Sequence, residues 1–252
     1  MTGNTKRVDP GAIRHPVWTA IGVLIVVAAI AAGIALWVIG SRDKVQITST
    51  TFSTQVWPVA EGATSTPLDV AVRNHGDDLR TTSIDTAVLE AYGLAPCFDS
   101  TALDARTAEP AETIDGDYTI KLPAVTDASP AVAAQTVTTP FDHAVPGGGG
   151  STFTFSVGPS SQPANRVQAF VFRPTLNLNR GNLGLPSVAL ATTPELVRAY
   201  LDGIAALSPD ARAAQASCAR SQVNQIDRLF ALSSLRSAPL TQLHDAYAAL
   251  AD

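Results

Sequence analysis

An uncharged stretch of twenty-four residues, from Val17 to Gly40, limits the possible folds more than any other feature of this sequence. As an α-helix it would be about 36 Å long, enough to cross a hydrocarbon core of roughly 30 Å. Trp18 and Trp37 would then lie near the two membrane interfaces, where tryptophan is enriched. The stretch is too long for a cleaved signal peptide. The sequence therefore predicts an uncleaved transmembrane signal anchor over residues 17–40, in contact with the lipid bilayer.

The charges beside this stretch indicate its orientation. Three basic residues precede it and two follow it: Lys6, Arg7 and Arg14, then Arg42 and Lys44. Because positive charge favours the cytoplasmic side, we expect a cytoplasmic tail over residues 1–16 and an extracytoplasmic domain from residue 41 onward. The predicted localisation is the cell membrane, with a single pass. An excess of arginine over lysine, fourteen to three, is typical of a G+C-rich bacterial genome.

Residues 41–178 have the alternating pattern of β-strands. Leu68, Val70 and Val72, for example, share one face of a predicted strand. The clearest strand pair, residues 151–157 and 167–173, contains phenylalanines that are expected to fill the centre of the domain. Six to eight short strands separated by turn residues predict an extracytoplasmic β-sandwich of immunoglobulin-like type. Residues 179–191 are expected to form a linker.

The pattern changes in residues 192–252, which we expect to form a C-terminal α-helical extension. A hydroxyl residue is followed within two positions by proline at Thr193, Ser208 and Ser237, and each pair is a signal for the start of a helix. Apolar residues then recur at helical spacing, so each helix has one apolar stripe. These stripes must be buried on the sandwich, on one another or on a partner.

The two cysteines of the chain, Cys97 and Cys218, fall in different parts of it. If they pair, the bond ties the second helix to the sandwich and closes a loop of about 120 residues, which the chain-entropy model values at about 4–5 kcal/mol. We favour this disulfide over two buried free thiols, because both cysteines lie on the predicted outer side, where disulfides persist.

The four histidines do not form a recognisable site. His15 lies in the predicted tail, and His75, His143 and His244 are spread over the outer part. His143 follows Asp142, but a tetrahedral zinc site needs three or four protein ligands, and the usual ligand spacings are absent. The acidic pairs Asp77-Asp78 and Asp115/Asp117 are better explained as turn residues than as calcium ligands. We therefore expect no metal and no cofactor.

Charge and motifs exclude several classes of function. Residues 45–165 contain four basic and fourteen acidic side chains, whereas residues 166–252 contain eight and six. Because most of the outer part is acidic, nucleic-acid binding is not expected. The sequence has no Gly-x-Ser-x-Gly elbow and no phosphate-binding loop, so we expect no catalytic residues.

These features together favour a membrane-anchored, extracytoplasmic accessory or interaction protein of a bacterial cell envelope, without enzymatic activity. Its partner would be another envelope protein. One alternative is an extracytoplasmic sensor that binds a solute or metal ion through the acidic part, with His143 in the site. A second alternative is an envelope hydrolase of unrecognised type.

Overall fold

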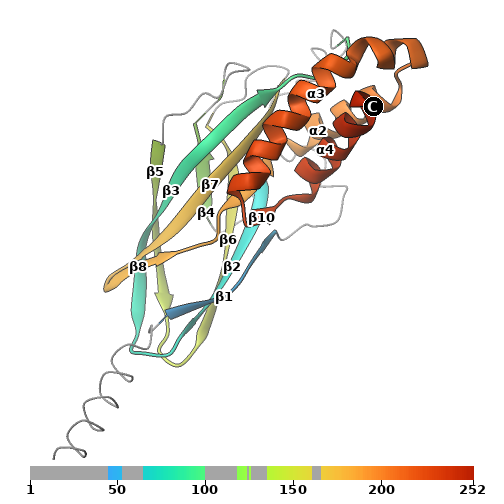
Figure 1. Cartoon of the computed structure of the whole chain (residues 1–252). Helices are drawn as coiled ribbons and strands as arrows, with labels where there is room; N and C mark the ends of the chain where they lie inside the picture. Colours follow the sequence, from blue (N-terminus) through green and yellow to red (C-terminus); the bar gives the residue numbers. More distant parts are fainter. Residues whose placement is uncertain (1–44, 53–64, 100–117, 124, 126–134, 161–165) are drawn as a thin grey trace, which may run out of the picture. The chain divides into compact units, whose positions relative to one another are not determined.

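The computed structural model describes residues 45–52, 65–99, 118–123, 125, 135–160 and 166–252. In this part the chain forms two β-sheets and three helices, and it is mainly β (Figure 1). Residues 44–252 belong to one compact unit.

The first sheet has four strands in the order β1-β2-β6-β4. They are β1 (Val45–Phe52), β2 (Thr66–Asn74), β6 (Gly150–Pro159) and β4 (Tyr118–Leu122). Neighbours are antiparallel except for β4, which runs parallel to β6. We call this sheet A.

The second sheet, sheet B, has the order β10-β9-β7-β3-β5, and β8 pairs with β7 beside this path. Its strands are β10 (Leu235–Arg236), β9 (Val188–Ala191), β7 (Val167–Leu178), β3 (Leu79–Leu94), β5 (Gln135–Val145) and β8 (Gly181–Gly184). The two longest strands, β3 and β7, pair along most of their length and form the centre of the sheet.

The inner faces of the two sheets bury one apolar cluster, the sandwich core. Five phenylalanines in it are almost fully buried: Phe141, Phe153, Phe155, Phe170 and Phe172. Phe141 contacts Phe153 edge-on, with ring centroids 4.9 Å apart, and Phe155 at 5.2 Å. The prediction that the strand aromatics fill the centre of the sandwich is confirmed.

The helices are α2 (Pro194–Ala205), α3 (Pro209–Leu232) and α4 (Ala238–Ala251). Each begins at the predicted hydroxyl and proline signal. The Ser208 side chain accepts a hydrogen bond from the Ala211 amide, as expected for an N-cap. The Thr193 and Ser237 side chains make no capping bond, and the Thr193 backbone is left-handed (φ 58°).

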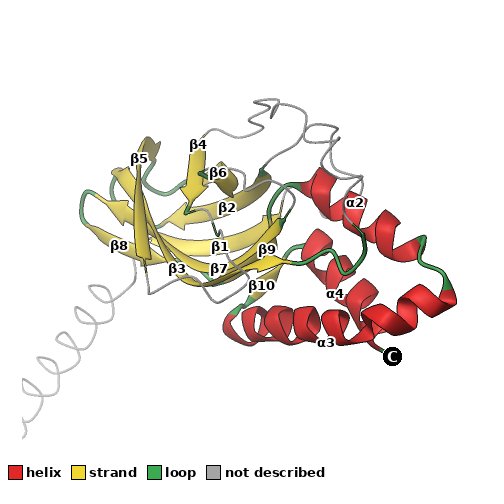
Figure 2. Ribbon diagram, turned by 90° about the horizontal axis from the view of Figure 1, so that it is seen from above, coloured by secondary structure: helices red, strands yellow, loops and turns green. Residues whose placement is uncertain are grey.

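The helices lie against the outer face of sheet B at one end of the sandwich (Figure 2). Alternate residues of β7 therefore face two different cores. Phe170 and Phe172 point into the sandwich, whereas Ala169 and Val171 pack under the helices. A strand buried on both faces has a continuous apolar sequence rather than an alternating one, which explains the run of apolar residues at 169–172.

The membrane part of the predicted fold class is wrong. Among the described residues, none of the helices is both long and apolar enough to span a bilayer. Two of them have only 12 and 14 residues, and the 24-residue α3 carries charged side chains such as Arg220 and Asp227. Contrary to the predicted single-pass architecture and cell-membrane localisation, the described part of the chain therefore contains no helix that could serve as the span. The tail 1–16 and the segment 17–40, with Trp18 and Trp37, lie outside the described residues.

Two further features of the predicted fold need correction. The two sheets of an immunoglobulin fold are antiparallel, but here β4 is parallel to β6 and β10 is parallel to β9. The predicted linker over residues 179–191 contains β8 and β9, which both pair with β7. Both short strands therefore extend sheet B, and β9 also packs under the helices through Ala189 and Ala191.

Candidate interaction site

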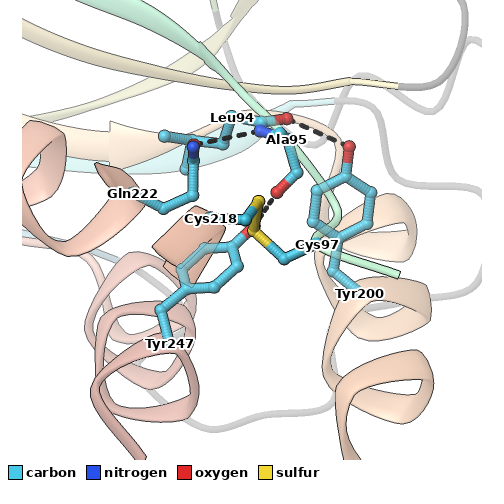
Figure 3. Close-up of a disulfide and its surroundings, with 7 residues drawn as sticks. All are labelled: Leu94, Ala95, Cys97, Tyr200, Cys218, Gln222 and Tyr247. Atoms are coloured by element: carbon cyan, nitrogen blue, oxygen red, sulfur yellow. Dashed lines mark hydrogen bonds between the residues drawn. A yellow bond between two sulfur atoms is a disulfide. The ribbon is translucent and has the colours of Figure 1, made fainter. Parts of the chain in front are cut away.

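All three helices hold the same short segment of chain where β3 ends. The Tyr200 hydroxyl of α2 donates a hydrogen bond to the Leu94 carbonyl, at 3.1 Å. The Ala95 amide donates to Oε1 of Gln222 in α3, at 3.0 Å. The Ala95 carbonyl accepts a hydrogen bond from the Tyr247 hydroxyl of α4. Figure 3 shows these side chains converging on the strand end. We call the three side chains, together with Leu94 and Ala95, the clasp.

The predicted disulfide between Cys97 and Cys218 is present and completes the clasp (Figure 3). It joins residues 121 positions apart and connects the chain after β3 to α3. Cys97 is buried, and its backbone is left-handed (φ 56°), a conformation that is uncommon for residues other than glycine. The covalent bond therefore holds Cys97 in a conformation that a cysteine would otherwise rarely adopt.

Phe98 adds a second contact between the clasp and α2. Its ring contacts Tyr200 edge-on, with centroids 5.9 Å apart, and it lies directly over Gly203. A Cβ added at Gly203 would come within 2.4 Å of the Phe98 ring. A side chain at position 203 would therefore displace the Phe98 ring from this close contact.

Burial keeps both clasp tyrosines in their neutral form. Burial raises the pKa of Tyr200 to about 12, and it raises the pKa of Tyr247 well above its ordinary value. Desolvation has this effect because it disfavours the charged phenolate. Both hydroxyls therefore remain hydrogen-bond donors to the clasp over the whole neutral pH range.

Arginines from neighbouring segments bind the carboxyl ends of the helices. Arg212 donates to the carbonyls of Ile204, Ala205 and Leu207 at the end of α2. Arg220 of α3 donates to the Ala251 carbonyl of α4, at 2.9 Å. Cations are favourable at helix carboxyl ends, and none of the three helices has a basic residue in its own last turn. The caps therefore also connect one helix to the next.

The outer face of α3 is open to solvent along its whole length. Seven of its exposed residues recur at alternating spacings of four and three, and they are mostly small or polar: Asp210, Ala214, Ser217, Ser221, Asn224, Arg228 and Ala231. Leu232 ends this face, and 45% of its surface is exposed. Within the described residues, it is the exposed large apolar side chain. The arrangement is a fixed helical surface with an apolar residue at one end.

The structure separates Asp142 from His143. Arg80 donates two hydrogen bonds of 2.8 Å to the Asp142 carboxylate, and the bond from Arg80 lowers the pKa of Asp142. The His143 ring instead packs near Phe141 and Phe153, with centroids 6.2 and 5.1 Å away. The adjacent Asp and His side chains therefore do not form an acid–base pair.

The remaining predicted turn residues link the turn between β2 and β3 to other loops. Asp78 accepts a hydrogen bond from the Gly147 amide at 2.7 Å, Asp77 pairs with Arg180 at 3.4 Å, and His75 is exposed in the same turn. Asp115 and Asp117 lie outside the described residues. Within the described ranges, no group of three or more histidine, cysteine or acidic side chains could hold a metal ion.

His244 has a role that sequence reasoning missed. Its two ring nitrogens lie 3.1 Å from Asp227 of α3 and 3.2 Å from Asp245 of α4. Its ring packs against Phe230, and the Arg236 guanidinium lies 4.3 Å from the centroid of the same phenyl ring. His244 and Asp227 come from different helices, so no local sequence pattern indicated this contact.

Comparison with known proteins gives little further information. No family model matches the chain, and no curated protein matches it. Among solved structures, a match was found to Spo0M, a sporulation control protein from Bacillus subtilis, at 9% sequence identity and a TM-score of 0.24. The match covers 56% of this chain and 49% of that chain, so about half of each is compared. Similarity at this level carries no conclusion about function.

Proposed function

We propose that this protein is a non-enzymatic accessory protein that binds another protein through the outer face of α3 and the neighbouring helical surface. The observation that supports the proposal most directly is the clasp, which binds all three helices to one strand end with hydrogen bonds and a disulfide. A surface that is fixed before binding loses less conformational entropy when a partner docks. The helical layer is therefore suited to present a binding surface of constant shape.

The composition of the α3 face supports the same function. Small side chains such as Ala214, Ser217 and Ser221 let another backbone approach closely, and they lose little rotamer entropy on contact. Leu232 provides an apolar group that a partner pocket could bury. Full burial of a leucine contributes about 1.5–3 kcal/mol, and the 45% of Leu232 that is still exposed would contribute part of this. The ion-sensor alternative has less support, because Asp142 binds Arg80 rather than lining a site with His143.

Site-specific photocrosslinking in the source cells tests this proposal. A photoreactive residue at Ser217 or Asn224 on α3 is expected to capture the same stoichiometric partner protein. The matched control is the same probe at Gln135, an exposed residue at the start of β5, which is expected to capture none of that partner. Leu232→Asp is expected to reduce capture at least tenfold while leaving the thermal transition unchanged.

Three results would contradict the proposed function. These are equal capture from Gln135 and Asn224, no adduct from either α3 position although the probe itself reacts, and full capture by the Leu232→Asp variant.

A further inference from the structure

The outer edge of β1 has no strand partner in the part of the chain that the structure describes. β1 is the first strand of sheet A and pairs only with β2. Its eight residues contain no charge and no proline, and five of them are β-branched, a composition that favours strand pairing. Such an edge presents unpaired backbone amides and carbonyls to any extended segment that approaches it.

The other sheet edges have features that hinder strand addition. β5 contains Pro140, its pairing with β3 is irregular, and its Asp142 forms an exposed ion pair with Arg80. β4 has five residues, with an exposed lysine at position 121, and β10 has two residues. Proline, charge, irregular pairing and short length are known means of blocking edge-to-edge contact. Among the described strands, β1 combines length with an edge free of charge and proline.

A β-bulge makes the order of residues that face the core and residues that face outward the same when β1 is followed from either end. Opposite residues of an antiparallel pair share a face, and Ile47, Thr50 and Phe52 lie opposite the core residues Val72, Val70 and Leu68. The register shifts between Ile47 and Ser49, so Thr48 is the extra residue. The inward set is Val45, Ile47, Thr50 and Phe52, and the outward set is Gln46, Ser49 and Thr51.

This distribution matches itself when the strand is paired with an antiparallel copy about a two-fold axis between Thr48 and Ser49. Val45 of one copy then lies opposite Phe52 of the other, and Ile47 opposite Thr50, so inward residues meet inward residues. Gln46 lies opposite Thr51 on the outward face. A strand with uninterrupted alternation would place Val45 and Phe52 on opposite faces. The two bulges also face each other, so neither interrupts the register.

We propose that β1 pairs with β1 of a second copy of this chain in this register, forming a two-fold symmetric dimer with one continuous eight-stranded sheet. The contact is isologous, and it closes after two copies. Because one strand edge is a small interface, the dimer is expected to be weak and concentration-dependent. It would place two helical layers in one particle.

Disulfide trapping in the full-length protein tests the register. The double variant Gln46→Cys/Thr51→Cys places thiols opposite each other only between copies, because the two positions are five residues apart on one strand. Mild oxidation is expected to give a covalent dimer on a non-reducing gel. The control, Gln46→Cys/Ser49→Cys, has no opposed thiols in this register and is expected to remain monomeric. Equal trapping of both variants, or of neither, overturns the proposal.

Two variants with introduced charges test the strength of the same contact without a covalent bond. Gln46→Lys/Thr51→Lys places like charges opposite each other twice and is expected to weaken dimerisation about tenfold in analytical ultracentrifugation. Gln46→Lys/Thr51→Glu places opposite charges there and is expected to dimerise at least as tightly as the unmodified protein. Equal thermal transitions at low concentration would show that both monomers are folded. If both variants dimerise equally, β1 is not the interface.

Discussion

The sandwich and the helical layer are stabilised by different kinds of contact. The five fully buried phenylalanines lie in the sandwich core, whereas the three fully buried tyrosines, Tyr92, Tyr200 and Tyr247, lie in the core beneath the helices. Apolar burial is strong but non-directional, so it holds the two sheets together without specifying single partners. A tyrosine hydroxyl must reach one acceptor. The clasp therefore specifies the position of each helix, while the phenylalanines fill the centre of the sandwich core.

Removing the disulfide is expected to lower the stability of the protein most, and to affect the helical layer more than the sandwich. The variant Cys97→Ala/Cys218→Ala loses a cross-link over 121 residues, which the chain-entropy model values at about 4–5 kcal/mol. Chemical denaturation measures the loss. Hydrogen exchange is expected to rise most in α2, α3 and α4, because the three hydrogen bonds of the clasp then act without the covalent bond. A uniform rise over both sheets would show that the helices are not a separately held layer.

Two neighbouring residues of β7 allow the two cores to be tested separately. Phe172 faces the sandwich core and Val171 faces the helical core. Phe172→Ala is expected to cost about 3–5 kcal/mol and to raise hydrogen exchange in both sheets. Val171→Ala removes fewer buried atoms, about 2 kcal/mol, and is expected to raise exchange mainly in the helices. Identical exchange maps for the two variants would mean that the two cores unfold as one.

Alkaline pH is expected to loosen the helical layer. Because the pKa of Tyr200 is raised to about 12 in the folded protein, and that of an unfolded tyrosine is about 10, the folded state binds the phenolic proton more tightly. The stabilisation is therefore complete below pH 10 and is lost as the pH rises from 10 towards 12. Denaturant unfolding at pH 8 and pH 11, followed by the circular dichroism signal of the helices, measures this loss of stability.

Two matched variants test whether the loss of stability at alkaline pH comes from the clasp. Tyr200→Phe is expected to be less stable at pH 8, because the Leu94 carbonyl loses its donor, and to lose less additional stability at pH 11. Tyr118→Phe, on β4 in the sandwich, is expected to keep the alkaline loss of the unmodified protein. The same loss at pH 11 in all three proteins would show that Tyr200 does not contribute.

The sequence predicted those features that depend on local chemistry. The three helix starts, at Thr193, Ser208 and Ser237, follow from a hydroxyl residue close to a proline. The phenylalanines of β6 and β7 lie in the sandwich core as expected. The Cys97–Cys218 pairing followed from the chain having two cysteines, both in the part predicted to lie on the outer side. In each case, a few neighbouring residues or a unique pair carried the information.

Features that depend on tertiary contacts were missed. Tyr200 and Tyr247 fit the apolar stripes of their helices, and their hydroxyls reach backbone carbonyls 106 and 152 residues away. β8 has the sequence Gly-Asn-Leu-Gly and becomes a strand only because β7 offers it a partner. The membrane expectation rested on the local pattern of residues 1–44, and the helices of the described residues are too short or too charged to span a bilayer. Local pattern carries no information about such contacts.

The arginine caps give the smallest expected effect and the finest test of how the helices are held together. Arg212 binds three carbonyls at the end of α2, and Arg212→Ala is expected to cost about 0.3–1 kcal/mol, because a cation near a helix carboxyl end contributes that much. Exchange is expected to rise in the last turn of α2 and to remain unchanged in the sandwich. Arg173→Ala, which removes an exposed arginine from β7, is the matched control and is expected to leave α2 unchanged. High salt is expected to narrow the difference between the two variants, because screening weakens the interaction of a cation with the helix dipole. If the difference between them persists at high salt, Arg212 acts mainly through its hydrogen bonds and packing rather than through its charge.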